Sequence, residues 1–594
     1  MSDTSPVEGP TPGRGGWSAR GDLTAAALCV AVGVAISILP HLIWWPRLGA
    51  PVYVADRDDM LYLAVAGQAY DNHPTYLGDP SRATPGSGIY QWLIFVPGIL
   101  VARVLGWGPM GVDLAWRTLA GAGIALGWYA CLRQYFRRPW VAAALAIVLL
   151  VDIGTGRLPL LVRPLDYAIR LGTGRVGTLF ASFPTIHVQW RLINPGLSLP
   201  FLLLHLALLA RARSRPTCLR LAWSGLGMGL LFYVYFYYWT AAGLALVLAL
   251  AVDTGHRRVY LATGLIGGLV GLPSVLASAA LKRSTSPDWL PRSDMFLPIP
   301  RFSEILVPKL AIILLVVGLA WVWVRRRDLI YPMALATAGL VLLNHQVVTG
   351  LQIQNFHWNY VWNIGFSYLY VLLIAGALFE RPTLPRWAVA GLMALCLVEA
   401  GAGFWFRAEE ASRTQQTREI LAEYRRYREQ RQVPVAPRLV ANAGIAGARD
   451  FVDLAAVLEN QRPLEHYAAM LSPAIDDAEW DRRLALNAAL LGLDRPAFAA
   501  HARYNCDGWG PWSRDPSLRA QRLDGLLRTF DALRADPTDA SDAFGVRYVA
   551  IETTRPPPAY LRSGWRLLQD GPSWRVWERR PASRTEADGV TGDG

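Results

Sequence analysis

The sequence has little charge and little cysteine, and each shortage excludes a class of protein. Only 17% of the 594 residues are charged while 53% are hydrophobic, which excludes an ordinary soluble protein. The five cysteines, Cys29, Cys131, Cys218, Cys396 and Cys506, offer neither a disulfide framework nor the ligand spacing of a metal site. The glycine-rich stretches GTGRLP and GTGRVGT lack the strand–turn–helix setting of a phosphate loop, and no internal repeat is present. What remains is a polytopic membrane protein with a sizeable water-soluble part.

The net charge of +13 comes mostly from arginine, which raises the question of nucleic acid. The arginines cluster between apolar runs, so membrane topology explains them better, and no nucleic-acid partner is expected. The 24 tryptophans and 23 tyrosines suit the aromatic belts of a membrane protein. They would also suit a carbohydrate-binding surface, where aromatic faces stack on sugar rings.

Apolar runs that are long enough to span a membrane recur along most of the chain. They fall at 22–45, 112–132, 139–153, 196–211, 221–253, 259–280, 307–324, 329–344, 358–379 and 386–405. The run 221–253 is too long for one helix, so we divide it at Tyr238–Thr240. The pattern therefore predicts about eleven transmembrane helices.

The segment Ile89–Gly108 has the length of a span but contains Pro97, Gly98 and Arg103. If it does not cross the membrane, the arginine clusters fall on the same side as the N-terminus, as the positive-inside rule requires. These clusters are Arg133/Arg137/Arg138, Arg211/Arg213/Arg215/Arg220, Arg257/Arg258, Arg325/Arg326/Arg327 and Arg381/Arg386. We therefore expect Ile89–Gly108 to be an amphipathic or re-entrant helix, with the N-terminus inside and the C-terminus outside.

The expected domains follow from this topology. They are a disordered cytoplasmic N-terminus at 1–21, a transmembrane domain at 22–405 with its first outer loop at 47–111, a charged helical linker at 406–436, a small extracytoplasmic α/β domain at 437–580 and a disordered tail at 581–594. In the α/β domain, FGVRYVAIETT and GWRLLQDGPSWRVWERR alternate like strands, and the second of them contains a Gly-Pro turn. The stretch DAEWDRRLALNAALLGL predicts a helix.

The first outer loop begins with three carboxylates, Asp56, Asp58 and Asp59, directly after a predicted span. Asp58 or Asp59 would cap the helix that MLYLAVAGQAY predicts, and in an extended segment Asp56 and Asp58 would point to one side. The aspartates could serve only to cap that helix and to keep the loop hydrated. The functional alternative is a general base, or a pair that binds a divalent cation.

Three later outer loops carry the other candidate residues. The loop at 154–195 holds His187, Arg191 and Asn194, the loop at 281–306 holds Lys282, Arg283 and Arg301, and the segment Asn344–Tyr360 holds His345, Gln354, His357 and Trp358. Cations on the outer side could contact lipid headgroups or pair with nearby aspartates. They would also suit an anionic, lipid-linked phosphate, because arginine presents a fork of donors. The polar and aromatic segment Asn344–Tyr360 is typical of a binding-site wall, or of a loop that satisfies its own backbone.

Several of these stretches resemble the GT-C superfamily of integral membrane glycosyltransferases, over roughly 22–405. They are DRDDMLYLAVAGQAYDN, the arginine of DLAWRTLAGAG, RLINPGLSLPFLLL, GLLFYVYFYYWT and NHQVVTGLQIQNFHW. The sequence looks most similar to bacterial members, and it departs from the family at DRDD, where many members have a tighter acidic pair. The resemblance implies a polytopic α-helical fold in the bacterial cytoplasmic (inner) membrane. It also implies that the active site and the C-terminal domain lie outside.

The activity that the resemblance implies is hexosyl or pentosyl transfer from a polyprenyl-phosphate donor to an acceptor hydroxyl on a glycan, lipid or protein, next to membrane lipids. The catalytic candidates are Asp58, Asp59 and Asp56, and the candidates for binding the donor phosphate are Arg191, Lys282, Arg283 and Arg301. The expected pocket residues are His187, Asn194, His345, Gln354, His357 and Trp358. If the reaction uses a divalent cation (Mg or Mn), Asp56 and Asp58 are its expected ligands.

Three other functions are consistent with this sequence. A polysaccharide polymerase or ligase would place its essential arginine and histidine residues in a later loop and would not need the first-loop carboxylates. A lipid-linked glycan transporter or flippase would favour paired charges inside the spans, broken helices and repeats. The spans contain few charges, which argues against a transporter. A membrane scaffold would keep its function after Asp58 and Asp59 are neutralised.

Overall fold

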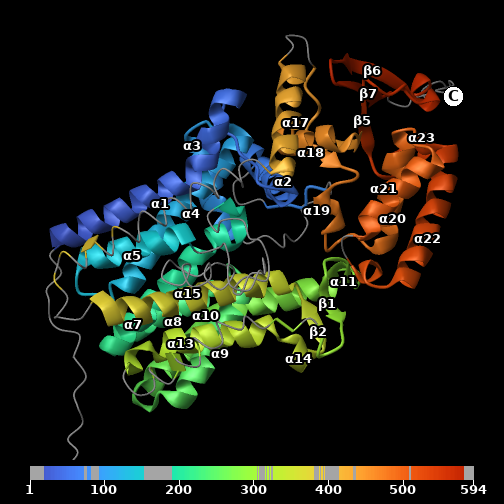
Figure 1. Ribbon diagram of the computed structural model, residues 1–594. Helices are drawn as coiled ribbons and strands as arrows, with labels where there is room; N and C mark the ends of the chain where they lie inside the picture. The colour runs from blue at the N-terminus through green and yellow to red at the C-terminus, as the bar shows by residue number, and fades with distance from the viewer. Residues whose placement is uncertain are drawn as a thin grey trace, which may run out of the picture. The chain divides into compact units, whose positions relative to one another are not determined.

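The computed structural model describes residues 19–72, 77–81, 92–152, 190–303, 305–306, 326–379, 414–432, 437–507 and 510–580, with single residues between 315 and 322 and between 385 and 394. The chain divides into two compact units, and Figure 1 labels their elements. Unit 1 comprises Met1–Ala55, Tyr90–Ser284 and Met295–Thr417. Unit 2 comprises Asp56–Ile89, Thr285–Asp294 and Arg418–Gly594.

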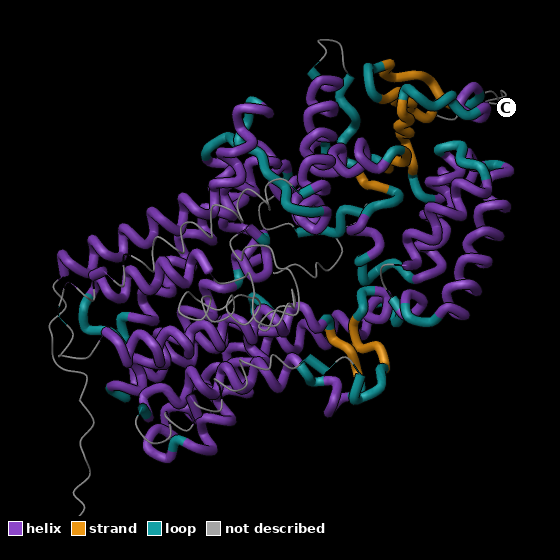
Figure 2. Tube along the Cα trace, in the orientation of Figure 1, coloured by secondary structure: helices purple, strands orange, loops and turns teal. Residues whose placement is uncertain are grey.

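Unit 1 is built from apolar helices. They are α1 (Ala19–Leu48), α3 (Trp92–Val104), α4 (Gly108–Leu132), α5 (Pro139–Asp152), η2 (Leu192–Leu197), α7 (Leu199–Ser214), α8 (Cys218–Leu231), α9 (Phe236–Val252), η3 (Thr254–His256), α10 (Arg257–Ser284), η4 (Arg327–Leu329), α13 (Ile330–Leu343), α14 (Gln346–Thr349) and α15 (Asn355–Phe379). Two short antiparallel strands, β1 (Met295–Pro298) and β2 (Leu351–Ile353), pair between them. Figure 2 shows these strands in orange among the helices.

The described helices test part of the predicted membrane topology. Three of them are long and apolar enough to cross a membrane, at Arg20–Leu48, Pro195–Ser214 and Thr254–Arg283. The run 221–253 forms two helices as expected, but the break lies at Phe232–Tyr235 and not at Tyr238–Thr240. The expected spans 307–324 and 386–405 lie mostly outside the described residues. The count of about eleven spans stays a prediction, as does the placement of α3 against the membrane.

Helices α1 and α4 approach each other closely because glycines face each other. A Cβ added to Gly33 would clash with the carbonyl oxygen of Gly121 and would lie 2.7 Å from the Cβ of Ala125. A Cβ added to Gly121 would clash with the carbonyl oxygen of Gly33 and with Ser37 Oγ. Small residues allow the backbones of membrane helices to meet at such distances.

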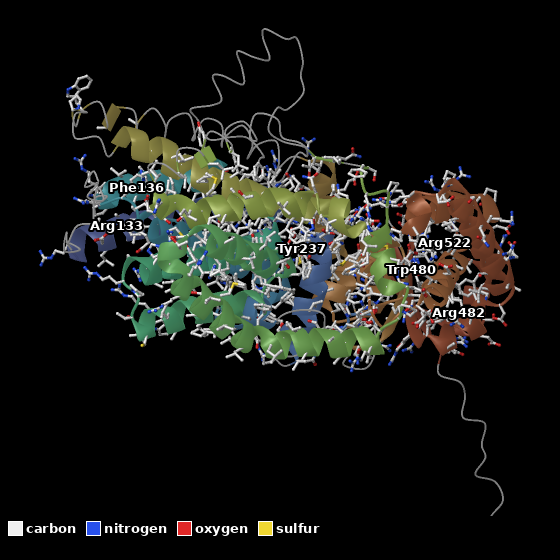
Figure 3. All side chains as sticks on the ribbon, turned by 90° about the horizontal axis from the view of Figure 1, so that it is seen from below. Arg133, Phe136, Tyr237, Trp480, Arg482 and Arg522 are labelled. Atoms are coloured by element: carbon white, nitrogen blue, oxygen red, sulfur yellow. The ribbon has the colours of Figure 1, made fainter. Side chains whose placement is uncertain are left out.

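Charged side chains are paired inside unit 1, near the ends of its helices. Arg133 Nε donates to Asp22 Oδ1 at 2.6 Å, which joins the end of α4 to the start of α1. Arg213 Nη2 donates to Asp253 Oδ2 at 3.2 Å, which joins the ends of α7 and α9. Figure 3 shows Arg133 at one end of the helical bundle and Tyr237 towards the other. Because these pairs lie at helix ends, the expectation of few charges inside the spans stays a prediction.

Unit 2 contains a five-stranded sheet with the order β4-β3-β5-β7-β6. Its strands are β3 (Gly444–Gly447), β4 (Arg462–Pro463), β5 (Val546–Glu552), β6 (Trp565–Asp570) and β7 (Trp574–Arg579). Strands β4, β3 and β5 are parallel, whereas β5, β7 and β6 are antiparallel. The strand and the hairpin predicted at the C-terminal end of the domain are therefore confirmed, and the hairpin turns at Gly571 and Pro572.

The helices of unit 2 come from three separate parts of the chain. They are α2 (Arg57–Asp71), α11 (Trp289–Arg292), α17 (Gln415–Arg431, whose first three residues belong to unit 1), α18 (Arg449–Leu458), α19 (Tyr467–Met470), α20 (Asp477–Leu490), α21 (Arg495–Asp507), η5 (Pro511–Ser513), α22 (Pro516–Ala535), α23 (Pro537–Ala543) and η6 (Ala559–Arg562). The helix predicted by DAEWDRRLALNAALLGL is α20, which confirms it. Helix α2 packs on α18, so a segment of the predicted first outer loop shares a core with the C-terminal part of the chain.

Candidate active site

The three carboxylates of DRDD lie at the start of helix α2 in unit 2. Asp56 is the N-cap, and its Oδ1 accepts a hydrogen bond from the backbone N–H of Asp59 at 3.2 Å. The expectation that Asp58 or Asp59 caps the helix was wrong, because helical geometry begins at Arg57. For the same reason Asp56 and Asp58 do not point to one side as they would in an extended strand.

The three aspartates differ in burial, and this separates their possible roles. Asp59 keeps only 2% of its surface exposed, whereas Asp56 and Asp58 are half-buried. Asp56 uses one oxygen for the cap. Asp58 and Asp59 occupy the first turn, where the helix dipole favours an ionised carboxylate. Asp58 therefore combines a favoured negative charge with access to solvent.

The aspartates give limited support to a divalent cation. In the described part of the chain, no group of three or more histidine, cysteine or acidic residues is arranged to hold a metal ion. Asp56 and Asp58 alone would supply two carboxylates, and Mg²⁺ commonly takes one or two carboxylates together with substrate phosphate and water. Asp56 would have to share its capping oxygen or use the other one.

In unit 1, Arg191 is held by an aromatic side chain at the start of η2. Its Nη1 donates to the hydroxyl oxygen of Tyr360, on helix α15, at 3.2 Å. Tyr360 is buried, and Arg191 is half-buried. Four cations were expected to bind the donor phosphate. Among the described contacts of these four, Arg191 is the one with a hydrogen bond to a tyrosine of another helix, and its guanidinium lies 5.5 Å from the ring centre of that tyrosine.

Tyrosines at the start of α9 face the polar end of α15. The Tyr235 hydroxyl forms a hydrogen bond with His357 Nδ1, and the Tyr237 hydroxyl donates to Gln354 Oε1 at 3.1 Å. The ring of Tyr237 lies 4.7 Å from that of His357 and 4.6 Å from that of Trp358. Figure 3 labels Tyr237 among the side chains of the helices. The structure thus brings the predicted residues Gln354, His357 and Trp358 together with tyrosines.

The backbone at Gln354 is strained. Its φ of +35° is in the left-handed region that side chains other than glycine rarely adopt. Gln354 lies between β2 and α15, so this conformation turns the chain from the strand into the helix. Such strain costs about 1–3 kcal/mol and is concentrated at functional sites.

Arg117 lies in a fully buried network of unit 1. Its Nε donates to Asp113 Oδ2 at 2.9 Å, and Asp113 Oδ2 lies 2.7 Å from His41 Nε2. Its Nη1 donates to the backbone carbonyl of Trp190, the residue before Arg191. Its guanidinium lies 4.8 Å from the ring centre of Tyr53, three residues before Asp56. Arg117 therefore holds both the segment that leads to Arg191 and the segment that leads to the acidic turn.

The remaining predicted residues have other placements. Lys282 and Arg283 are exposed in the last turn of α10, where Lys282 Nζ lies 5.6 Å from the ring centre of Phe296, and Arg301 is exposed beside Gly350. His345 is buried, and its ring lies 5.8 Å from that of Trp358. His187 and the side chain of Asn194 lie outside the described residues.

Sequence reasoning missed three tyrosines of this region, Tyr235, Tyr237 and Tyr360. The signal was present, because FYVYFYYWT is dense in aromatic residues. From the sequence, we use this run to divide a long apolar stretch, whereas the structure places two of its hydroxyls on partners in and beside α15.

Comparison with known proteins finds a likeness only among structures. No family model matches the chain, and no curated protein matches it. The crystal structure of ArnT from Cupriavidus metallidurans bound to undecaprenyl phosphate is 11% identical in sequence. The likeness covers 94% of this chain and 99% of that chain, with a TM-score of 0.48. A likeness at this identity and TM-score assigns no activity, so the function has to follow from the residues.

Proposed function

We propose that this protein is a membrane glycosyltransferase of the GT-C type. It would transfer a hexose or pentose from a polyprenyl-phosphate donor to an acceptor hydroxyl on the outer face of a bacterial cytoplasmic membrane. The observation that carries the proposal is Arg191, a cation held by Tyr360 inside a bundle of apolar helices. An ionisable group kept in such surroundings marks a functional site by default.

Arg191 has the chemistry that a lipid-linked phosphate requires. Its guanidinium presents several N–H donors in a planar fork, and one of them donates to Tyr360. A sugar phosphate needs no general acid, since its leaving group is already a weak base, but it needs positive charge where negative charge develops. The rings of Tyr237 and Trp358 supply flat apolar faces for a sugar.

The acceptor proton needs a general base, and Asp58 is the best candidate of the three first-loop aspartates. Asp56 caps the helix, and Asp59 is almost fully buried, whereas Asp58 is half-buried. A carboxylate within hydrogen-bond reach of the acceptor hydroxyl would remove its proton as the oxygen attacks the anomeric carbon. If a divalent cation takes part, Asp56 and Asp58 would hold it and it would neutralise phosphate charge.

The first test is native mass spectrometry of the protein purified in mild detergent. A co-purifying polyprenyl-phosphate sugar would support the proposal, and its mass would identify the sugar class. Asp58→Asn should abolish transfer of that sugar, whereas Asp71→Asn, at the exposed other end of α2, should not. Full activity of Asp58→Asn would remove the general base from the proposal and would favour a polymerase or ligase.

A transporter of lipid-linked glycans is the second candidate, and the buried charge network favours it. His41, Asp113 and Arg117 are fully buried together in the helices of unit 1, as in many transport pathways. The two functions differ in their product. A transporter would move an intact lipid-linked glycan between leaflets of a vesicle and release no polyprenyl phosphate.

A further inference from the structure

Helix α2, which carries the acidic turn, is nearly enclosed within unit 2. Ten of its fifteen residues are buried, including Met60, Leu61, Leu63 and Val65. A Cβ added to Gly67 would clash with the backbone carbonyl oxygen of Val457 on α18, so the two helices meet without a side chain between them. Figure 1 shows α2 beside α18. Small displacements of α18 therefore move α2 with it, because close-packed elements transmit strain.

The arginine of DRDD is bound by the C-terminal part of the chain. Arg57 Nη2 donates to Glu423 Oε1 at 2.7 Å, and its Nη1 donates to Glu423 Oε2 at 2.9 Å. The same Nη1 donates to Asp453 Oδ2 at 3.2 Å. Glu423 is on α17 and Asp453 is on α18, so one guanidinium ties the first residue of α2 to two other helices. A two-point contact of this kind fixes orientation as well as distance.

The charge balance determines what Arg57 can do. Arg57 is only 19% exposed, Glu423 11% and Asp453 3%. Asp453 Oδ2 also lies 3.7 Å from Arg449 Nε. The charge of Arg57 is therefore balanced chiefly by Glu423 and is not available to a phosphate. Burial raises the pKa of Glu423, and the Arg57 guanidinium opposes that rise. The guanidinium of Arg57 thus binds carboxylates of the C-terminal domain, although Arg57 lies between Asp56 and Asp58 in the sequence.

A second set of contacts holds the later part of the same loop. Ser472 donates from its hydroxyl to Asp79 Oδ2, and Arg483 Nη1 donates to the carbonyl of Ser81 at 3.3 Å. Ser472 and Arg483 both belong to the C-terminal domain. The first outer loop is therefore anchored at two places, and the anchor at Arg57 lies one residue from Asp58.

We infer that Arg57, Glu423 and Asp453 are positioning residues, through which the C-terminal domain sets the orientation of the acidic turn and of Asp58. This inference rests on the proposed function, because it assigns the C-terminal domain a part in the same reaction. None of the three residues touches substrate. They determine how the Asp58 carboxylate is oriented. A misplacement of a catalytic group by about 1 Å can lower a rate by roughly 100-fold.

The variant that tests this is Glu423→Gln. It removes the bidentate charge pair but keeps the contact of Arg57 with Asp453, a carboxylate that Arg57 shares with Arg449. The amide keeps the shape of the side chain, so unit 2 should fold. The matched control is Glu429→Gln on the same helix, where Glu429 is 56% exposed and pairs only weakly with Arg425. Gly67→Val provides a second route, because it forces α2 away from α18 without any change in charge.

Two readouts are needed, both on the full chain in detergent. Hydrogen–deuterium exchange of residues 57–71 should rise about tenfold in Glu423→Gln and in Gly67→Val, and not in the control. The donors are synthetic undecaprenyl-phosphate hexoses and pentoses, and a detergent extract of bacterial cell envelope supplies the acceptor hydroxyls. Release of undecaprenyl phosphate on sugar transfer should show a kcat lowered by roughly 10- to 100-fold, with the KM for the donor changed by less than about twofold. Arg57→Lys, which keeps the charge and loses the fork, should be intermediate.

The outcomes separate the inference from the proposed function. Unchanged exchange in α2, or faster exchange with an unchanged kcat, would overturn the positioning role. If Asp58→Asn abolishes release while Glu423→Gln behaves like the wild type, the function stands and the inference fails. If the wild type and Asp58→Asn release equal amounts or none, the proposed function fails and the positioning of a base fails with it.

Discussion

Arg117 of unit 1 and Arg292 of unit 2 are buried in different ways. In unit 1, Arg117 is fully buried and faces a carboxylate, Asp113, that is equally buried. In unit 2, Arg292 is 1% exposed, but its carboxylate, Asp477, is 29% exposed, and its other bonds go to the backbone carbonyls of Met470, Ser472 and Ile475. A charge among apolar helices needs its counter-charge beside it, because water is too distant to screen it. A buried arginine whose carboxylate partner reaches solvent can be satisfied by backbone carbonyls as well.

The largest effect is expected from Arg117→Ala. The substitution leaves Asp113 buried beside His41 with no strong cation, and breaking a buried pair in this way costs about 3–5 kcal/mol. Thermal unfolding in detergent should show a large loss of stability or of folded yield. Arg103→Ala, at an exposed position on α3, should leave stability unchanged. If both variants were equally stable, Arg117 would have no structural role in the bundle.

Arg292→Ala should cost less, about 2–3 kcal/mol, because the carboxylate it leaves behind, Asp477, is 29% exposed and can be hydrated, whereas Asp113 is 1% exposed. The loss should be confined to unit 2 and can be followed by hydrogen–deuterium exchange of α19 and α20. The control is Arg425→Ala, whose pair with Glu429 is exposed on both sides and should contribute about 0.5 kcal/mol or less. A loss as large as that of Arg117→Ala would contradict the comparison.

The close contact of α1 and α4 offers a smaller test within unit 1. Gly121→Ala places a methyl group against the carbonyl of Gly33, and such overpacking costs about 1–3 kcal/mol. Gly268→Ala, on α10, has no heavy atom within 4 Å of the new Cβ and should be neutral or slightly stabilising. Thermal unfolding of the two variants measures the difference. Equal stabilities would mean that the helices can separate without cost.

Elements with a strong local pattern were predictable from the sequence. The β6–β7 hairpin follows from two alternating segments around Gly571 and Pro572, and α20 follows from helical periodicity. The break inside the run 221–253 was expected because no single helix fits it, but its position was wrong. Local aromatic density does not specify where a helix ends, and the structure begins α9 at Phe236.

The contacts that shape the candidate site were not predictable, because their partners lie far apart in the chain. Arg57 and Glu423 are 366 residues apart, and Tyr235 and His357 are 122 apart. Neither pair has a periodic or spacing signal. The acidic turn could be singled out because it follows an apolar run, but its association with the C-terminal domain depends on tertiary packing. The cap at Asp56 was missed for a related reason, since Asp56, Asp58 and Asp59 have equal capping preferences.

The smallest expected effect concerns pH and unit 2. Burial raises the pKa of the Asp481 carboxyl from 3.8 to about 6, although Arg522 lies beside it. The folded state therefore binds this proton more tightly than the unfolded state does. Protonated Asp481 therefore adds to the free energy of unfolding. This contribution is fully present below pH 3.8 and is lost as the pH rises through about 6.

Asp481→Asn should remove this dependence. Relative to the variant, the wild type should lose on the order of 1–2 kcal/mol between pH 4 and pH 7. Hydrogen–deuterium exchange of α20, corrected for the intrinsic effect of pH on exchange, measures this difference. Asp531→Asn, whose side chain is 47% exposed in its pair with Arg495, is the control and should follow the wild type. Parallel profiles for Asp481→Asn and the wild type would show that Arg522 compensates fully for burial. In that case Asp481 would be stabilised by Arg522 as fully as Asp113 is by Arg117 in unit 1.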